Sequence, residues 1–278
     1  MNRYGASPED SSLGRSVQYC EQYAPELLFP IPRQSKRDEI GVAANKLPFQ
    51  GQDIWNAFEL SWLNLRGKPQ VAMATFRIPA ESPNLIESKS FKLYLNSYNQ
   101  TRLDGEDELL ARLTRDISQA AGAPVSVELT LPKDFAAARM GDLPGESLDA
   151  LDIEIDHYHP SPDYLVTTSE RVSESLHSNL LKSNCLVTGQ PDWASILIRY
   201  VGRKLDREGL LRYLVGFRQH NEFHEQCVER IFVDIWKACQ PSELTVYARY
   251  TRRGGLDINP FRTSGKGLVP ENIRTARQ

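Results

Sequence analysis

The sequence predicts an α+β fold in which paired helices pack on one face of antiparallel sheets. Three observations predict it. Apolar and polar residues alternate over 125–131, which is the period of a half-buried strand. Apolar residues recur at intervals of three and four over 106–121 and 223–238, which marks one face of a helix. The order strand, strand, helix, helix, strand, strand in the first half is broadly repeated in the second half, which indicates two similar modules.

The composition is that of a globular protein. The 278 residues suffice for one large domain or two of ordinary size. The hydrophobic share is 40% and the charged share 25%. No apolar run approaches the ~20 residues of a membrane span, and the N-terminal residues contain no signal-peptide core, so we expect no membrane association. A net charge of −3 and a pI of about 6.0 argue against a dedicated nucleic-acid binder.

The cysteines indicate a reducing compartment. Cys20, Cys185, Cys227 and Cys239 form no CxxC pair and no dense framework. We therefore expect reduced thiols in a cytoplasmic protein.

The first module is expected at residues 51–160, after an arm at 1–50. Pro8, Pro25, Pro30 and Pro32 interrupt the arm, which we predict to be irregular and packed on the body. The elements expected in the first module are strands at 54–63 and 70–78, a helix from about 88 that is capped by Ser88 or Ser90, a helix at 106–121, a strand at 125–131 and a strand through Leu151, Ile153 and Ile155.

The second module is expected at residues 161–263 and is followed by a tail. The elements expected in it are strands at 172–182 and 194–201, helices at 207–219 and 223–238, with Asn221 as a cap of the second helix, and a strand at 244–250. The tail at 264–278 is rich in Gly, Lys and Arg, and we predict that it is loose.

A short loop in the second module carries a candidate for chemistry. Cys185 follows the strand at 172–182, and Asp192 lies seven positions later, across Gly189 and Pro191. Glycine permits unusual backbone angles and proline fixes one angle, so the loop should be compact. A thiol and a carboxyl on one rigid loop can serve as nucleophile and proton carrier. On spacing alone, Cys185 could equally be a small buried side chain, and Asp192 could cap its own turn.

Five stretches together resemble one known family. They are Lys182-Ser183-Asn184-Cys185, Gln190-Pro191-Asp192-Trp193, Glu87-Ser88-Lys89-Ser90-Phe91-Lys92-Leu93-Tyr94, Asn221-Glu222-Phe223-His224-Glu225-Gln226-Cys227 and Arg252-Arg253-Gly254-Gly255-Leu256-Asp257-Ile258-Asn259-Pro260. In their order along the chain they resemble the 7-cyano-7-deazaguanine reductases, which are NADPH-dependent nitrile reductases of queuosine biosynthesis. The resemblance extends from about residue 55 to about residue 262 and fits the long, two-module form of that family.

The resemblance implies both an architecture and a reaction. The architecture would be two tunnelling-fold modules in tandem, whose antiparallel sheets join across subunits, so a homodimer is expected. The reaction would convert the nitrile of 7-cyano-7-deazaguanine into the aminomethyl group of 7-aminomethyl-7-deazaguanine with two NADPH. Cys185 would form a thioimide with the nitrile carbon, and Asp192 would donate a proton to the nitrogen. Lys182 or a helix N-terminus could stabilise the thiolate, and a poorly solvated site would raise the pKa of Asp192.

The resemblance also implies the binding residues. The substrate base would bind Ile86, Glu87, Ser88, His224 and Glu225, and NADPH would bind Ser88, Lys89, Arg253 and Gly254. Without the resemblance, each position has an ordinary explanation: acidic side chains are favoured at helix starts, and Arg253-Gly254 could be a solvated turn. No GxGxxG segment follows a strand, so the sequence does not predict a Rossmann cofactor site.

Two other interpretations remain open at this stage. His157 and His159 form a His-x-His pair, but no third ligand lies nearby in sequence, so we expect no metal site. The same fold could also serve a purine- or pterin-processing hydrolase that uses Cys185, or a binding module without catalysis.

Overall fold

The structure is a computed structural model that describes residue 10 and residues 19–278. The part of the predicted arm at positions 1–9 and 11–18 lies outside the described residues. The chain forms two compact units, which are described separately. The first comprises the described residues up to Lys36, Asp53–Arg139 and Arg252–Ile258, and the second comprises Arg37–Gln52, Met140–Thr251 and Asn259–Gln278. Residues 140–160, which the sequence placed in the first module, thus belong to the second unit.

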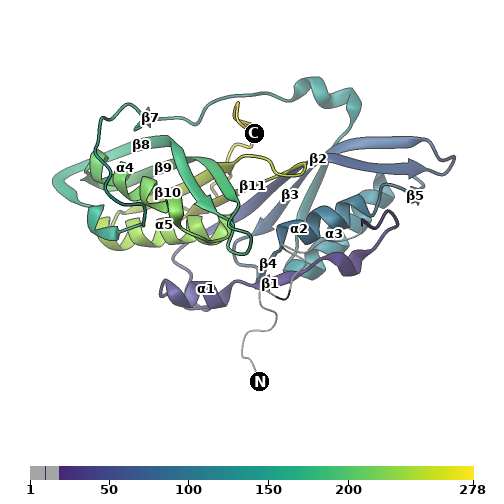
Figure 1. Cartoon of the computed structure of the whole chain (residues 1–278), viewed down its shortest axis with the longest axis horizontal. Helices are drawn as coiled ribbons and strands as arrows, with labels where there is room; N and C mark the ends of the chain where they lie inside the picture. Colours follow the sequence, from purple (N-terminus) through teal and green to yellow (C-terminus); the bar gives the residue numbers. More distant parts are fainter. Residues whose placement is uncertain (1–9, 11–18) are drawn as a thin grey trace. The chain divides into compact units, whose positions relative to one another are not determined.

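The first unit packs two helices against an antiparallel sheet (Figure 1). Its strands lie in the order β6-β3-β2, and a separate pair is formed by β1 and β4. Phe76 on β3, Phe91 on α2 and Leu113 on α3 are fully buried in one apolar cluster. The elements are η2 (Pro25–Leu27), β1 (Pro30–Pro32), β3 (Pro69–Pro79), β4 (Asn84–Ile86), α2 (Ser88–Asn96), β5 (Arg102–Leu103), α3 (Glu106–Ala121), β6 (Ser126–Thr130) and η3 (Pro132–Ala137).

Three elements contribute residues to both units. They are α1 (Gln34–Glu39), β2 (Gln50–Asn64) and β11 (Leu256–Thr263).

The second unit has the same kind of layering. Strands β11, β10, β9 and β8 are antiparallel neighbours, and a short β7 pairs in parallel with β8. Helix α5 contacts β9 and β10, and α4 contacts β8. Its elements are β7 (Glu146–Ser147), η4 (Pro162–Tyr164), β8 (Thr167–Asn184), β9 (Pro191–Leu205), α4 (Arg207–Val215), η5 (Gly216–Gln219), α5 (His224–Cys239) and β10 (Glu243–Tyr250). The mixed class, with antiparallel sheets and helices, is therefore as the sequence predicts.

The strand predicted through Leu151, Ile153 and Ile155 is wrong. These residues are half-buried, which explains their alternation, but they form no strand. Alternation reports an extended segment with one covered side, whereas a strand also needs a hydrogen-bonding neighbour.

The arm and the tail are more ordered than predicted. Ile31, between two prolines, pairs with Leu85, so β1 forms where the sequence predicts only irregular chain. At the other end, Thr275 and Gln278 are 8% and 3% exposed, so the prediction of a loose tail is wrong for these residues.

The helix predicted at 207–219 consists of two pieces. The α-helix ends at Val215, and a 3-10 turn continues to Gln219. A Cβ atom on Gly216 would lie 2.7 Å from the backbone oxygen of His159, so this position is closely packed against another segment.

In the part of the chain that the structure describes, no helix is long and apolar enough to cross a membrane.

Candidate active site

The loop between β8 and β9 is short and internally hydrogen-bonded. Strand β8 ends at Asn184, and Cys185 follows directly. The N–H of Cys185 donates to the carbonyl of Gln190 at 2.8 Å, and the N–H of Gly189 donates to the carbonyl of Cys185 at 3.0 Å. Gly189 has a φ of 67°, a region that favours glycine. The compact loop expected from the sequence is therefore present, and it holds Cys185 with only 6% exposure.

Asp192 lies on the returning strand, directly across the ladder from Ser183. The residue is 3% exposed, and its Oδ1 lies 3.4 Å from Nε2 of His224. The ring of His224 packs edge-on against the ring of Tyr250, with 4.1 Å between the centroids. The structure thus brings together Asp192 and His224, which the sequence separates by a helix and a strand, and adds Tyr250, which sequence reasoning missed.

Helix α5 begins inside the protein and not at its surface. Phe223 occupies the N-cap without a side-chain hydrogen bond, so the predicted cap at Asn221 is wrong. His224 and Glu225, the first two residues of the helix, are 8% and 2% exposed. Both side chains are therefore enclosed by the protein.

The segment before α5 is hydrogen-bonded to the residue that precedes Cys185. The N–H of Asn184 donates to the carbonyl of His220 at 2.8 Å, and the N–H of Glu222 donates to the carbonyl of Asn184 at 3.0 Å. The side chain of Asn221 accepts from the amide of Asn184 at 3.0 Å. This parallel bridge joins the end of β8, where the loop of Cys185 begins, to the segment that leads into α5. Nothing in the local sequence predicts it, because its two sides are far apart along the chain.

Lys182 is directed toward Asn184 and the backbone. Its ammonium donates to Oδ1 of Asn184 and, at 2.7 Å, to the carbonyl of Arg218. Burial lowers the pKa of Lys182, the charge of Arg218 lowers it further, and the charge of Asp192 acts in the opposite direction. These contacts give Lys182 a role in holding the end of β8.

The remaining cysteines of the second unit are unsuited to nucleophilic chemistry at neutral pH. Burial raises the pKa of Cys227 to about 12, assisted by the charge of Glu222. Burial also raises the pKa of Cys239 to about 11. Both side chains are therefore neutral thiols, which leaves Cys185 as the candidate nucleophile of this unit.

The other predicted site residues lie in the first unit, around the start of α2. Glu87 is fully buried and occupies the N-cap, where it accepts from the N–H groups of Lys89 at 2.6 Å and Ser90 at 2.8 Å. The prediction that Ser88 or Ser90 caps this helix is therefore wrong. Burial raises the pKa of Glu87, although both N–H groups and the charge of Lys92 act in the opposite direction.

The neighbours of Glu87 hold its backbone. Ile86 is 1% exposed and pairs with Pro30 of β1. The N–H of Glu87 donates to the carbonyl of Phe29 at 2.9 Å. The arm thus braces the segment that carries Glu87, while Ser88 and Lys89 are half-buried.

Arg253 and Gly254 form a tight hairpin turn in the first unit. The N–H of Arg253 donates to the carbonyl of Leu256 at 2.9 Å, and Gly254 and Gly255 have φ values of 56° and 75°. A Cβ atom on Gly254 would lie 3.6 Å from Nζ of Lys92. The turn therefore lies beside a lysine that sequence reasoning missed, on the helix that begins at Ser88.

In the His-x-His pair, His157 has a neighbouring partner. Nδ1 of His157 lies 2.8 Å from Oδ1 of Asp156, and both side chains are exposed. Among residue 10 and residues 19–278, no three His, Cys, Asp or Glu side chains are grouped so that they could hold a metal ion.

Comparison with known proteins identifies similar sequences over the whole chain. The profile of the family described as "Nitrile reductase, 7-cyano-7-deazaguanine-reductase N-term" matches residues 19–129, and the profile described as "QueF-like protein" matches residues 191–267. The NADPH-dependent 7-cyano-7-deazaguanine reductase of Chromobacterium violaceum is 67% identical over 279 residues, covering 100% of both chains. The protein with that name from Ralstonia nicotianae is 60% identical over 274 residues, covering 98% of this chain and 99% of that one.

One solved structure is also similar. It is described as an archaeosine synthase QueF-Like in the apo form, and it has 18% identity and a TM-score of 0.31. It covers 37% of this chain and 99% of the other.

Proposed function

The chain belongs to the family of NADPH-dependent 7-cyano-7-deazaguanine reductases, and from this premise we propose that it reduces the nitrile of 7-cyano-7-deazaguanine to a primary amine. The product is 7-aminomethyl-7-deazaguanine, a precursor in the synthesis of queuosine. The reduction consumes two NADPH. Curated relatives that match nearly the full length carry this activity in their names, which supports the reaction and the cofactor.

We propose that Cys185 is the nucleophile. A nitrile carbon is a poor hydride acceptor, and covalent catalysis divides a difficult step into easier ones. The Sγ atom of Cys185 forms a bond to the nitrile carbon as one π bond of the C≡N group breaks, and the nitrogen takes up a proton. The result is a thioimide, which accepts a hydride as an imine does. The observation that supports this role is the tight loop that holds Cys185 directly after the last ladder pair, Asn184 and Pro191, which is one pair beyond Ser183 and Asp192.

Asp192 is the proposed proton donor. A buried carboxyl can carry a proton to the nitrogen as sulfur attacks the carbon, and exclusion of water protects the imine that follows. Asp192 is 3% exposed, and the imidazole of His224 at 3.4 Å gives it a titratable neighbour. His224 and Glu225, at the start of α5, are proposed to bind the substrate base, since a carboxylate accepts well from the N–H groups of a guanine-like edge.

Glu87, Ile86 and Ser88 of the first unit are also proposed to bind a substrate base. Glu87 already accepts two backbone N–H groups, one on each oxygen, and a carboxylate has about four acceptor positions. Its remaining positions can therefore take donors from a ligand.

The nicotinamide nucleotide is assigned to Ser88, Lys89, Arg253 and Gly254, and it supplies the hydrides. The donor set of the first unit fits its phosphates. Lys89 and Arg253 bring positive charge, and Lys92 lies beside Gly254, which has no side chain to block an approach to the backbone. Two tunnelling-fold modules in tandem are further proposed, and their limits at 51–160 and 161–263 remain a prediction from the sequence, distinct from the limits of the two compact units. A homodimer is also proposed, and sedimentation velocity would test it.

Mass spectrometry of the protein mixed with the nitrile in the absence of NADPH tests the nucleophile. The parent protein should gain the mass of the nitrile on Cys185, and Cys185→Ala should gain none. Asp192→Asn should bind the nitrile with little change in affinity and form the adduct at least about 100-fold more slowly, because positioned proton donors contribute that much.

Two results would contradict these assignments. Full turnover by Cys185→Ala would show that Cys185 is not the nucleophile. An Asp192→Asn variant that forms the adduct as fast as the parent would show that Asp192 is not the proton donor. NADPH oxidation separates the reductase from the hydrolase alternative, because a hydrolase would process its substrate without consuming NADPH.

A further inference from the structure

The hydrogen-bond ladder between β10 and β11 stops short of the end of β10. Thr245, Val246 and Tyr247 pair with residues 261–263 of β11. The next residue of β11 is Pro260, which has no N–H to donate, so the ladder cannot continue through it. Tyr250, the last residue of β10, is nevertheless 1% exposed. A carbonyl buried there needs a donor from elsewhere.

Gln278 supplies that donor. Its side-chain nitrogen Nε2 donates to the carbonyl of Tyr250 at 2.9 Å and to Oδ1 of Asn259 at 2.7 Å. Its Oε1 accepts from Nε of Arg249 at 3.0 Å and from the N–H of Thr275 at 3.0 Å. Gln278 is 3% exposed. Its amide therefore joins β10 to β11 where the backbone ladder does not.

The residue held by Gln278 contacts the candidate active site on its other side. The ring of Tyr250 packs edge-on against His224 with 4.1 Å between centroids, and Nε2 of His224 lies 3.4 Å from Oδ1 of Asp192. These three side chains are all more than nine-tenths buried. Tyr250 also pairs with Ala194 of β9, so Gln278 holds the side of the strand end that faces β11. A displacement of the Tyr250 carbonyl on that side would also move its ring.

We propose that Gln278 is a positioning residue: by holding the end of β10 it sets the ring of Tyr250 against His224, and thereby the geometry of the pair formed by His224 and Asp192. Gln278 touches no reacting atom in this role. The consequence for catalysis depends on the proposed function, whereas the consequence for the His224 ring does not.

Gln278→Ala and Gln278→Glu test the proposal. Both remove the two Nε2 donors, and the glutamate keeps an acceptor toward Arg249 and Thr275, so it remains testable if the alanine variant folds poorly. Without NADPH, the adduct on Cys185 should form about tenfold more slowly in both, with the dissociation constant of the nitrile within about twofold of the parent, since two buried hydrogen bonds are lost away from the ligand.

Arg277→Ala is the matched control. Nη2 of Arg277 donates to the carbonyls of Asn179 and Ala194, so it also docks the tail, but on β8 and β9. This variant should form the adduct within about twofold of the parent rate. Equal losses in Arg277→Ala and Gln278→Ala would mean that tail docking alone matters, and the proposal would be wrong.

Proton NMR gives a readout that needs no activity. The edge-on contact with Tyr250 should shift the ring-proton resonances of His224, and both Gln278 variants should reduce this shift while Arg277→Ala preserves it. Unchanged His224 resonances in the Gln278 variants would overturn the proposal. If the parent protein forms no adduct at all, the proposed function fails, and the NMR result alone decides the role of Gln278.

Discussion

Glu222 is a buried carboxylate on the segment that leads into α5. One of its oxygens accepts from His220 at 2.8 Å, and Arg230 donates to both oxygens at 3.0 Å. Burial by itself would raise the pKa of Glu222, but these hydrogen bonds and charges outweigh it and hold the pKa below its usual value. The N–H of Glu222 donates to the carbonyl of Asn184, so the backbone of this residue contacts the end of β8, directly before Cys185.

The lowered pKa predicts a pH dependence of stability. A carboxyl whose pKa is lower in the folded state stabilises the fold above its unfolded pKa, and this contribution is lost as the pH falls through the folded pKa. Glu222→Gln should therefore be less stable than the parent at neutral pH, and the difference should narrow below the unfolded pKa of about 4.3. Urea unfolding of both proteins across this pH range measures it.

The exposed pair of Glu208 and Arg212 provides the control for this prediction. Glu208→Gln should change the free energy of unfolding by less than about 0.5 kcal/mol at every pH, because exposed ion pairs contribute little. A constant difference between Glu222→Gln and the parent from neutral to acid pH would contradict the link between Glu222 ionisation and stability.

At the scale of elements, the hairpin of β8 and β9 determines the conformation of the loop that carries Cys185. The loop needs one residue with a positive φ, which Gly189 supplies at 67°, and a Cβ atom added there would meet no atom within 4 Å. A substitution at Gly189 would therefore cost conformational energy without a steric clash. Substitutions at Gly189 therefore test whether the loop needs this backbone conformation, without disturbing side-chain packing.

Gly189→Ala should destabilise the protein by about 1 kcal/mol, because alanine disfavours the left-handed region. Gly189→Asn should cost less, since asparagine adopts this region more readily. Urea unfolding measures both, and the rate of adduct formation should fall in the same order. Equal effects of alanine and asparagine would show that the loop does not depend on this backbone angle.

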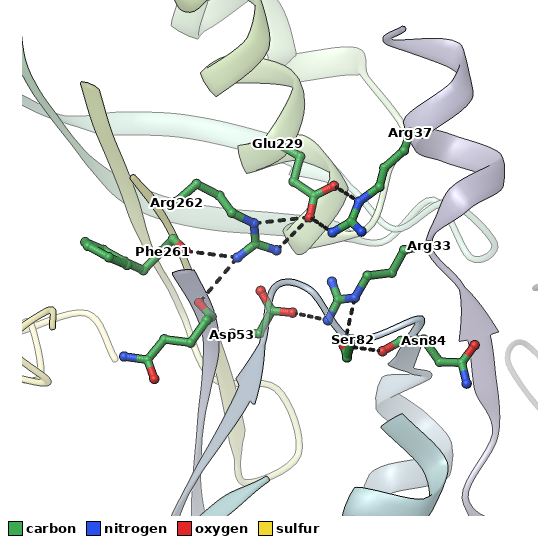
Figure 2. Close-up of polar contacts among 9 residues, drawn as sticks. Arg33, Arg37, Asp53, Ser82, Asn84, Glu229, Phe261 and Arg262 are labelled. Atoms are coloured by element: carbon green, nitrogen blue, oxygen red, sulfur yellow. Dashed lines mark hydrogen bonds and ion pairs between the residues drawn. The ribbon is translucent and has the colours of Figure 1, made fainter. Parts of the chain in front are cut away.

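At the scale of the whole molecule, a buried carboxylate joins segments that are far apart in sequence. Glu229 on α5 accepts from Nε and Nη2 of Arg37, 192 positions away, and from Nε and Nη2 of Arg262, 33 positions away (Figure 2). All three side chains are at most 5% exposed. In the first unit, Arg33 pairs with Asp53 at 2.5 Å and donates to Ser82 (Figure 2).

Glu229→Gln should destabilise the protein by about 3–5 kcal/mol, because it removes the charge that faces two buried guanidinium groups. The exposed pair of Glu170 and Lys204 offers a comparison, and Glu170→Gln should cost less than about 1 kcal/mol. The midpoint of urea unfolding measures both. A Glu229→Gln variant as stable as Glu170→Gln would show that this cluster does not hold the second unit together.

The spacing of apolar residues predicted helices and strands most accurately where their apolar residues recur regularly along the whole element. Strand β3 buries alternate residues, and the apolar residues of α5 recur at the spacing of a helix, so both are visible in the sequence within two residues of their ends. The same reasoning failed at Leu151, Ile153 and Ile155, because half-burial produces alternation whether or not a neighbouring strand is present.

Some features of the candidate site could likewise be predicted from the sequence, and others could not. The sequence by itself determined the types of element, the compact loop of Cys185 and Asp192, and the family, because these depend on residues close together in the chain. Only the tertiary structure decided that Glu87 caps α2, that Asn184 is bridged to the start of α5, that His224 lies against Tyr250 and that Gln278 is buried. Each of these is a contact between distant segments or a choice among neighbouring polar side chains, and the energy that selects it comes from burial, which a local pattern does not record.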